Sequence, residues 1–321
     1  MRKSMKPTIL FSIVCLTFTL FAGCKKEPVG TEANPLKMFF VPSEDTEGVM
    51  LSAEVIAKFL ESYVSKEVYG KEKGFYIKAA IPSSYVAVVE AVGTGRADFA
   101  AINTFGYVLL KNKKQYPGEA ILKTIRGKNE TSYKAQIIAR ADSGIQTLED
   151  LNGKKFAYTD PASTAGYVMP SQLFKAKGIT VGEEVFAHRH DNVVTMVYQG
   201  QVDAGATYYS PPGSDGVPRD ARGKVKTQFP DVFEKVKIVD FTDSVPNAPW
   251  ILRTNIFGED TEKYEKVKKA IQEGMVAFSA TEEGKEVFKN LYSITGLALS
   301  SDKDFVELLE MFKKIEGEES H

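Results

Sequence analysis

The chain has little cysteine, little histidine and no block of like charge. Its two cysteines, Cys15 and Cys24, both lie within the first 24 residues, so the body that follows has no pair available for a disulfide. The formal net charge is −1, with both signs spread along the chain, which argues against a nucleic-acid partner. No P-loop, HExxH or G-x-S-x-G pattern is present, so the sequence lacks the signatures of an ATPase, a zinc protease and an α/β-hydrolase.

The N-terminus predicts export. Three basic residues precede an apolar run from Ile9 to Phe21, which is too short to span a bilayer comfortably and has the length of a secretory signal. The ending "LFAGC" resembles a bacterial lipoprotein processing site, at which Cys24 becomes the lipidated first residue; an ordinary signal peptide with a chance cysteine is the alternative. We therefore expect a lipoprotein signal peptide over 1–24, a flexible tether over 25–35 and a membrane-anchored protein facing the periplasm or the cell exterior. Whether the anchor lies in the inner or the outer membrane stays open.

The body is long enough for two domains. Strand-like runs such as "LKMFFV" and "FYIKAAI" alternate with helix-like runs such as "GVMLSAEVIAKFLESYV" and "SYVAVVEAV". This alternation predicts an α/β fold with largely parallel sheets. The last 60 residues read as consecutive helices.

An internal repeat predicts two lobes of similar topology. "YVAVVEAVGTGRADFAA", starting at Tyr85, aligns without a gap with "HDNVVTMVYQGQVDAGA", starting at His190, and each copy reads as helix, glycine turn and strand. A weaker overlay places "KMFFVPSEDTEGVM" on "KFAYTDPASTAGYV", and the two units occur in the same order twice. We expect two βαβαβ lobes, with lobe I formed by 36–140 and 246–321 and lobe II by 141–245. Ligands of such sheets bind at the carboxyl ends of the strands, against helix N-termini.

The stretch "DPASTAGYVMP", residues 160–170, predicts an anion site. If "KKFAYTD" is a strand and a helix begins near Ser163, the first-turn amides have no intrahelical partners. These amides, the helix dipole and the hydroxyls of Ser163 and Thr164 form a set of donors for a tetrahedral anion, and Ala165 and Gly166 leave room for close approach. A simple N-cap is the alternative.

The repeat also nominates residues of the opposite lobe. Asp45, Thr46 and Glu47 overlay the anion-binding stretch, so the first lobe presents carboxylates where the second presents hydroxyls. We expect Asp45 or Glu47 to accept a hydrogen bond from a protonated ligand oxygen or an amino group; ordinary first-turn acids that stabilise a helix are the alternative. Likewise Tyr85 overlays His190, each at the head of a helix.

The two histidines of "FAHRH" would face one side of a strand that runs that far. A metal site needs further ligands, which the surrounding sequence does not supply, so we expect neither a metal nor another cofactor. His190, at a helix start, is placed to donate to an oxyanion, whereas His188 is expected to be structural.

Four stretches carry a family resemblance: "DPASTAGYVMP", "SYVAVVEAVGTGRADFAAINTFGYVLL", "HDNVVTMVYQGQVDAGA" and "SVPNAPWILR". They resemble the phosphonate-binding family of ABC-importer substrate-binding proteins, which includes phosphite and phosphate binders. The resemblance implies a bilobed, hinged periplasmic binding fold of type II. It also implies a ligand site made of Ser163, Thr164 and the Ala165 amide. Two tyrosines of that site correspond to Tyr85 and Tyr133, and a His-acid pair corresponds to His190 and Asp191.

The function that the resemblance implies is capture of a phosphorus oxyanion and delivery to a permease with its ATPase. Closure of the lobes would bring Tyr85, the 44–47 loop and Tyr133 onto the opposite face. The stretch "ATYYSPPGSDGVPRDARGKVKTQFP" differs from the pattern expected of aminophosphonate binders; its Tyr208 and Tyr209 either line the cleft or pack the sheet edge. We expect a monomer without enzymatic activity. A ligand-sensing lipoprotein that signals to a receptor is the alternative, and an enzyme acting on phosphorylated compounds would need a nucleophile or metal site that the sequence does not show.

Overall fold

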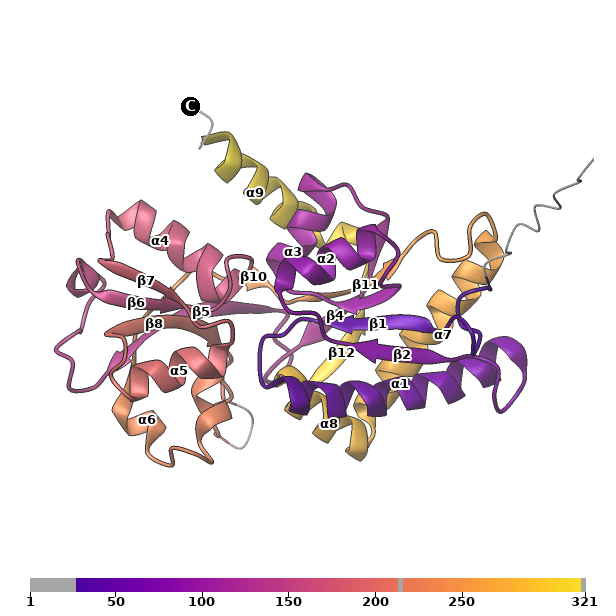
Figure 1. Cartoon of the computed structure of the whole chain (residues 1–321), viewed down its shortest axis with the longest axis horizontal. Coiled ribbons are helices and arrows are strands. Elements are labelled where there is room, and N and C mark those ends of the chain that lie inside the picture. The colour runs from indigo at the N-terminus through magenta and orange to yellow at the C-terminus, as the bar shows by residue number, and fades with distance from the viewer. Residues whose placement is uncertain (1–26, 213–215, 319–321) are drawn as a thin grey trace, which may run out of the picture.

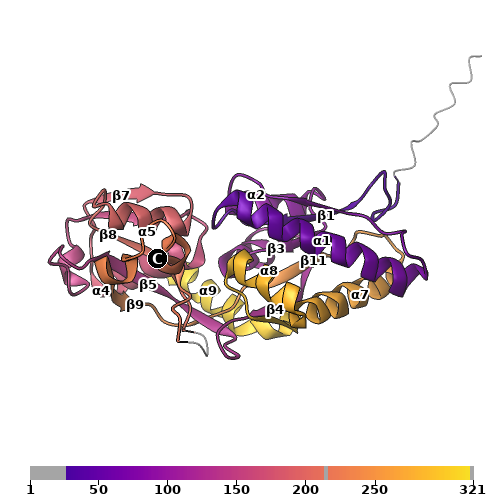
Figure 2. The ribbon, with the colours of Figure 1, turned by 90° about the horizontal axis from the view of Figure 1, so that it is seen from below.

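The computed structural model describes residues 27–212 and 216–318. They form two α/β lobes that lie side by side, each built on one six-stranded sheet (Figures 1 and 2). The predicted signal peptide and Cys24 lie outside the described residues. No helix of the described ranges is both long enough and apolar enough to cross a membrane.

The first lobe contains a mixed sheet in the order β12-β4-β11-β3-β1-β2. Strands β1, β2 and β3 are parallel, whereas β11 runs antiparallel to β3 and β4, and β12 runs antiparallel to β4. The expectation of a largely parallel sheet therefore holds only for the first three strands, because β11 and β12, which follow the second lobe in the chain, enter the sheet in the opposite direction. The strands are β1 (Leu36–Phe40), β2 (Ile77–Ala80), β3 (Phe99–Ala101), β4 (Gly118–Ile125), β11 (Pro249–Arg253) and β12 (Gly296–Leu299). Its helices are α1 (Thr46–Tyr69), α2 (Tyr85–Gly93), α3 (Thr104–Val108), α7 (Thr261–Ala280), α8 (Glu282–Tyr292) and α9 (Val306–Glu318).

Helices cover both faces of this sheet, with α1, α7 and α8 together on one face and α2, α3 and α9 on the other (Figure 1). Helix α1 shows how the sequence sets these elements: Asp45 caps its first turn, and Gly70 ends it in the left-handed conformation with φ +61°. Between these two caps, apolar residues at helical spacing face the sheet and are buried. The helices expected near the C-terminus are present as α7, α8 and α9, but they are not consecutive, because strand β12 lies between α8 and α9 and pairs with β4.

The second lobe contains the sheet β10-β5-β8-β6-β7, with β9 also paired to β5. Its strands are β5 (Ser132–Arg140), β6 (Lys155–Tyr158), β7 (Glu183–Phe186), β8 (Ala204–Tyr209), β9 (Val236–Phe241) and β10 (Val245–Pro246). Its helices are α4 (Met169–Lys177), α5 (His190–Tyr198) and α6 (Val232–Lys235), and the π-helical turn η3 (Thr164–Val168) leads into α4.

The internal repeat is confirmed in three dimensions. β1, β2 and β3 pair as β6, β7 and β8 do, with the first strand of each set in the middle. In the first lobe Asp98 accepts a hydrogen bond from the Lys37 N–H at 2.9 Å, and its counterpart Asp203 accepts one from the Lys155 N–H at 2.8 Å. The glycine turns also agree, because the two glycines that precede these aspartates have φ +72° and +70°.

Two segments cross between the lobes, one between β4 and β5 and one between β10 and β11. The expected boundary at residue 140 therefore falls at the far end of β5, which pairs with β8 and β9 of the second sheet. Asn247 ties the two crossings together: its side chain donates to the Thr124 and Glu130 carbonyls, at 2.9 and 2.8 Å, and its backbone N–H donates to the Thr131 carbonyl. We identify these adjacent crossings as the hinge.

The expected flexible tether is corrected in part. Residues 27–34 form turns against the first lobe: the Gly30 carbonyl accepts from the Tyr76 N–H at 2.9 Å, and Val29 is buried. Gly30 itself has φ +92° and lies against the ring of Phe75, where a side chain would not fit. This segment is part of the folded body because its apolar side chain and its backbone both find partners there.

Candidate ligand-binding cleft

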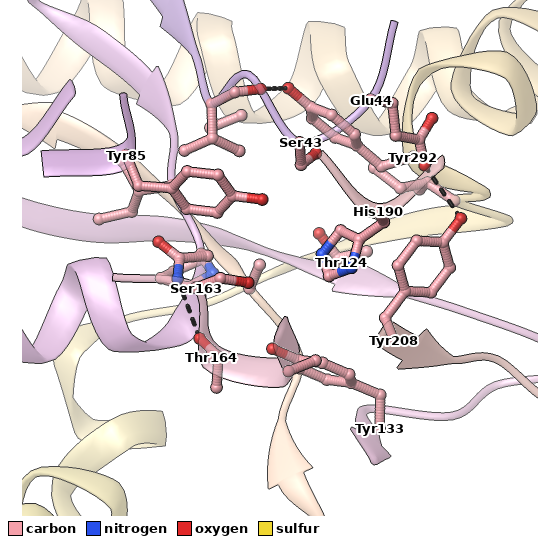
Figure 3. A pocket seen from close by; sticks show the side chains of 18 of the residues that line it. Ser43, Glu44, Tyr85, Thr124, Tyr133, Ser163, Thr164, His190, Tyr208 and Tyr292 are labelled. Carbon is pink, nitrogen blue, oxygen red and sulfur yellow. Dashed lines mark hydrogen bonds between the residues drawn. The ribbon is translucent and has the colours of Figure 1, made fainter. Parts of the chain in front are cut away.

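A cavity of about 70 Å³ lies between the two lobes, beside the hinge. Figure 3 shows its side chains converging from both lobes. In the same measure one water molecule needs about 10–15 Å³, so the space is large enough for a small molecule or ion of several non-hydrogen atoms. Residues of the first lobe and of the crossings that line it are Val41, Ser43, Glu44, Tyr85, Ala101, Ile102, Asn103, Thr124, Arg126, Ala248, Pro249, Trp250, Tyr292 and Ile294. Those of the second lobe are Tyr133, Ser163, Thr164, Ala165, His190 and Tyr208.

The helix start predicted at residue 163 forms one wall of this cavity. β6 ends at Tyr158, and Ser163 is the N-cap of η3, its hydroxyl oxygen accepting from the Gly166 N–H at 3.1 Å. The N–H groups of Thr164 and Ala165 belong to the first turn, where no carbonyl of the helix can reach them. Both residues are buried and line the cavity, so these amides lie at its wall rather than in bulk water. The wall is a preformed donor set for an anion.

Two further polar atoms in the cavity are buried and lack a partner among the described residues. They are the Tyr85 hydroxyl and His190 Nδ1. Tyr85 is only 2% exposed, and burial raises the pKa of its phenol far above the usual range, so it remains a donor. Buried polar atoms without partners are uncommon in proteins and call for an explanation such as a ligand.

Burial, assisted by the nearby Arg126 charge, lowers the pKa of His190 from 6.5 to about 3. The imidazole is therefore neutral at physiological pH in this structure and has one N–H donor. His190 is the first residue of α5, and its backbone N–H donates to the Ser43 carbonyl of the other lobe at 3.0 Å. Thus the ring is fixed at the junction of the lobes, with its edge on the cavity.

The positive charge of the cavity comes from the hinge. Arg126 follows β4, and its guanidinium donates to the Tyr292 carbonyl and lies 5.7 Å above the centre of the Tyr208 ring. An anion in the cavity would meet this charge in a poorly solvated site, where electrostatic attraction is stronger than in water.

The carboxylate of the cavity is Glu44, which is 5% exposed. Its Oε1 accepts from the Tyr208 hydroxyl at 3.0 Å, drawn in Figure 3, and its Oε2 lies 2.8 Å from Lys224 Nζ. Both partners belong to the second lobe, and Lys224 also donates to the Asn290 carbonyl of the first at 3.2 Å. The pair with Lys224 offsets the repulsion that Glu44 would otherwise exert on an anion.

The lobes are closed on each other. Besides the contacts of Ser43 and Glu44, Asn103 of the first lobe donates to the Ala162 carbonyl at 2.7 Å, and the Phe105 N–H donates to Thr164 Oγ1 at 2.8 Å. Hydrogen bonds therefore cross the cleft around the cavity.

The model of the family described as "ABC transporter, phosphonate, periplasmic substrate-binding protein" matches residues 50–305. The chain belongs to this family. The Phosphonates-binding periplasmic protein of Escherichia coli is 22% identical over 261 residues, covering 78% of this chain and 71% of that protein. The Phosphate-import protein PhnD of Mycolicibacterium smegmatis is 29% identical over 52% of this chain; the match spans 53%, about half, of the relative's length.

Solved structures agree on the fold. PhnD1 from Prochlorococcus marinus in complex with methylphosphonate superposes with a TM-score of 0.70 at 15% identity, over 88% of this chain and 98% of that one. A binding protein component of an ABC phosphonate transporter from Pseudomonas aeruginosa gives 0.67 at 19% identity, over 89% and 87%. The expected bilobed type II periplasmic binding fold is thereby confirmed.

Six of the residues nominated for the site in this family member lie together at the cavity: Ser163, Thr164, Ala165, Tyr85, Tyr133 and His190. Asp191 does not line it. That side chain is paired with Arg189 at 3.1 Å, and burial raises the pKa of its carboxyl.

Asp45, Thr46 and Glu47 also lie away from the cavity, and all three are exposed. Asp45 accepts from the Gly48 N–H as the cap of α1, and it pairs with Arg189 at 3.3 Å. The overlay correctly aligned Asp45, the N-cap of α1, with Ser163, the N-cap of η3. In the first lobe, however, the residues that line the cavity are the two just before the cap, Ser43 and Glu44. The carboxylate expected there is supplied by Glu44.

The strand expected to carry both histidines is shorter than predicted. β7 ends at Phe186, and His188 is exposed in the left-handed conformation with φ +66°, so it does not share a face with His190. In the part of the chain that the structure describes, no three His, Cys, Asp or Glu side chains are grouped as a metal site requires.

Sequence reasoning missed Ser43, Arg126, Thr124 and Tyr292 of the cavity and left Tyr208 undecided. Arg126 stands in no motif, and Tyr292 comes from the end of a helix far along the chain. One signal was available for Glu44, since it belongs to the 44–47 loop that was expected to close on the ligand.

Proposed function

We propose that this protein captures a small phosphorus oxyanion between its lobes and delivers it to an ABC permease. The observation that carries the proposal is the convergence of polar groups without partners in one closed cavity: the Tyr85 hydroxyl and His190 Nδ1, beside the first-turn amides of Thr164 and Ala165. Such donors, together with the Arg126 charge, suit an ionised tetrahedral group. The names of the two relatives, which mention phosphate and phosphonates, support the same ligand class.

The cavity volume favours phosphate, phosphite or a phosphonate with a short substituent. Glu44 bears on the choice among them. A carboxylate offers about four lone-pair sites, and Tyr208 and Lys224 account for two. A remaining site can accept a hydrogen bond from a protonated phosphorus oxygen, the role first assigned to Asp45 or Glu47.

Calorimetric titration tests this function. The chain without its first 24 residues retains every contact described above and is titrated with phosphate, phosphite, methylphosphonate and 2-aminoethylphosphonate, with sulfate as the control anion. We expect tight binding of at least one phosphorus anion, and loss of that binding when Ser163 and Thr164 are both replaced by alanine. If none of the phosphorus anions binds, the proposal is wrong.

The membrane role rests on the sequence. We propose that the chain is exported, lipidated at Cys24 and held at the membrane as a monomer, where a permease and its ATPase receive the ligand-bound form. Mass spectrometry of the membrane-extracted protein tests the anchor: a diacylglyceryl-modified Cys24 at the N-terminus is expected, and a free N-terminus elsewhere contradicts it.

A further inference from the structure

The Thr164 hydroxyl receives two hydrogen bonds from the opposite lobe. Asn103 Nδ2 donates to Thr164 Oγ1 at 3.0 Å, and the Phe105 N–H donates to the same oxygen at 2.8 Å (the first is drawn in Figure 3). Asn103 is the N-cap of α3 in the first lobe and Phe105 is the second residue of that helix, whereas Thr164 begins η3 of the second lobe. This contact therefore exists only when the lobes are together.

The orientation of the Asn103 amide is fixed by its partners. Its Oδ1 accepts from the Gly106 N–H at 3.2 Å as the cap of α3, while its Nδ2 faces two oxygens, those of Ala162 and Thr164. A flipped amide would place its oxygen against the Ala162 carbonyl oxygen and its NH2 group against the Gly106 N–H, so both of these hydrogen bonds would be lost. Asn103 consequently combines two functions, a cap within its own lobe and a donor to the other.

A hydroxyl has one hydrogen to donate and two lone pairs that accept. In the closed protein both lone pairs of Thr164 are taken, by Asn103 and Phe105, so its hydrogen must point elsewhere. Thr164 is 1% exposed and lines the cavity together with Tyr133, so the direction left for its hydrogen is toward the cavity and the anion proposed to bind there. The hydroxyl is thereby an obligatory donor to the cavity.

We propose that Asn103 is a positioning residue that couples lobe closure to anion binding by orienting the Thr164 hydroxyl toward the ligand. In the open form Thr164 can rotate and exchange hydrogen bonds with water. On closure, Asn103 and the Phe105 N–H fix the hydroxyl as a donor, which favours an ionised ligand oxygen over a P–OH group as the acceptor opposite, because hydrogen bonds to charged acceptors are stronger. This proposal rests on the proposed function and adds a residue to it.

Two replacements separate positioning from capping. Serine and aspartate are both good N-caps, so Asn103→Ser and Asn103→Asp each keep the acceptor for the Gly106 N–H. Serine removes the donors to Ala162 and Thr164; aspartate replaces them with an acceptor toward which the Thr164 hydrogen can turn. We expect the dissociation constant for the best-bound phosphorus anion to rise about tenfold in Asn103→Ser and further in Asn103→Asp.

The matched control is Asn112→Ser. Asn112 Nδ2 donates to the Leu309 carbonyl at 3.0 Å inside the first lobe, so this variant loses an amide donor without touching the cleft, and its affinity should stay at the wild-type value. Urea unfolding of each variant without ligand verifies that the fold is intact. Unchanged affinity in both Asn103 variants would show that the residue is only a cap.

A double-mutant cycle with Thr164→Val identifies the route. If Asn103 acts through the Thr164 hydroxyl, Asn103→Ser should add less than about twofold in a chain that already carries Thr164→Val. If the double variant instead loses affinity by the product of the two single-variant factors, the proposal is refuted, because Asn103 then acts independently of the Thr164 hydroxyl. Failure of the proposed function itself is distinguishable, since in that case the wild-type chain binds none of the phosphorus anions.

Discussion

Replacing Tyr85 by phenylalanine should leave the ligand-free protein at least as stable as the wild type and at the same time weaken ligand binding. The Tyr85 hydroxyl is buried in the closed cleft and has no hydrogen-bond partner among the described residues. The replacement removes one oxygen and leaves the packed ring in place. Because the hydroxyl has no hydrogen-bond partner among the described residues, the replacement separates its effect on the fold from its effect on ligand binding.

The structure sets the size of both effects. A buried polar group without a partner costs about 1–3 kcal/mol, so the free energy of unfolding should stay equal or rise by up to about that amount. A hydrogen bond to a charged acceptor contributes about 1.5–3 kcal/mol, so the dissociation constant for the phosphorus anion should rise about 10- to 150-fold. The two changes have opposite signs.

Urea unfolding without ligand and calorimetric titration measure the two quantities. Tyr107→Phe is the matched control, because its hydroxyl is also buried within the first lobe but donates to Asp302 Oδ1 at 2.7 Å, away from the cleft. Tyr107→Phe should lower stability by about 1–3 kcal/mol and leave affinity unchanged. A Tyr85→Phe protein that unfolds more easily by more than about 1 kcal/mol, or that binds as the wild type does, would refute the reasoning.

Three further predictions concern the cleft and the second lobe. Lys224→Met should lower affinity about tenfold or more by leaving the Glu44 carboxylate unneutralised beside the anion, and titration of the double variant with Glu44→Gln should recover part of the loss. Burial lowers the pKa of His190 to about 3, so the folded protein favours the neutral ring, and the stability that this ring contributes is fully present above pH 6.5. Below pH 6.5 the free energy of unfolding should fall by about 1.4 kcal/mol per pH unit. In His190→Gln the free energy of unfolding, measured with urea, should depend less on pH between 6.5 and 4 than in the wild type. Gly205→Ala should destabilise the protein by about 1–3 kcal/mol, because its Cβ would stand 2.5 Å from Val193 Cγ1; a urea midpoint equal to that of wild type would contradict this.

Sequence alone predicted the parts of this protein that depend on local chemistry. The cap at Ser163, the first-turn amides behind it and the glycine turns are fixed by residues a few positions apart, and hydrophobic periodicity gave the helices and strands around them. The internal repeat related residues that are far apart in the sequence. Two copies of one unit bury their apolar faces in the same way, so Tyr85 and His190 could be matched before any coordinates were known.

What the sequence left undetermined is how the two copies meet. The repeat placed Asp45 opposite Ser163 as cap to cap, yet the closed lobes turn Glu44 to the cavity and leave Asp45 at the surface, paired with Arg189. Arg126 reaches the anion site from the hinge. Hydrophobic periodicity and capping describe contacts within one unit of the repeat. Which side chains line the cleft depends on how the two units pack and on the path of the chain between them, and only the tertiary structure decides these.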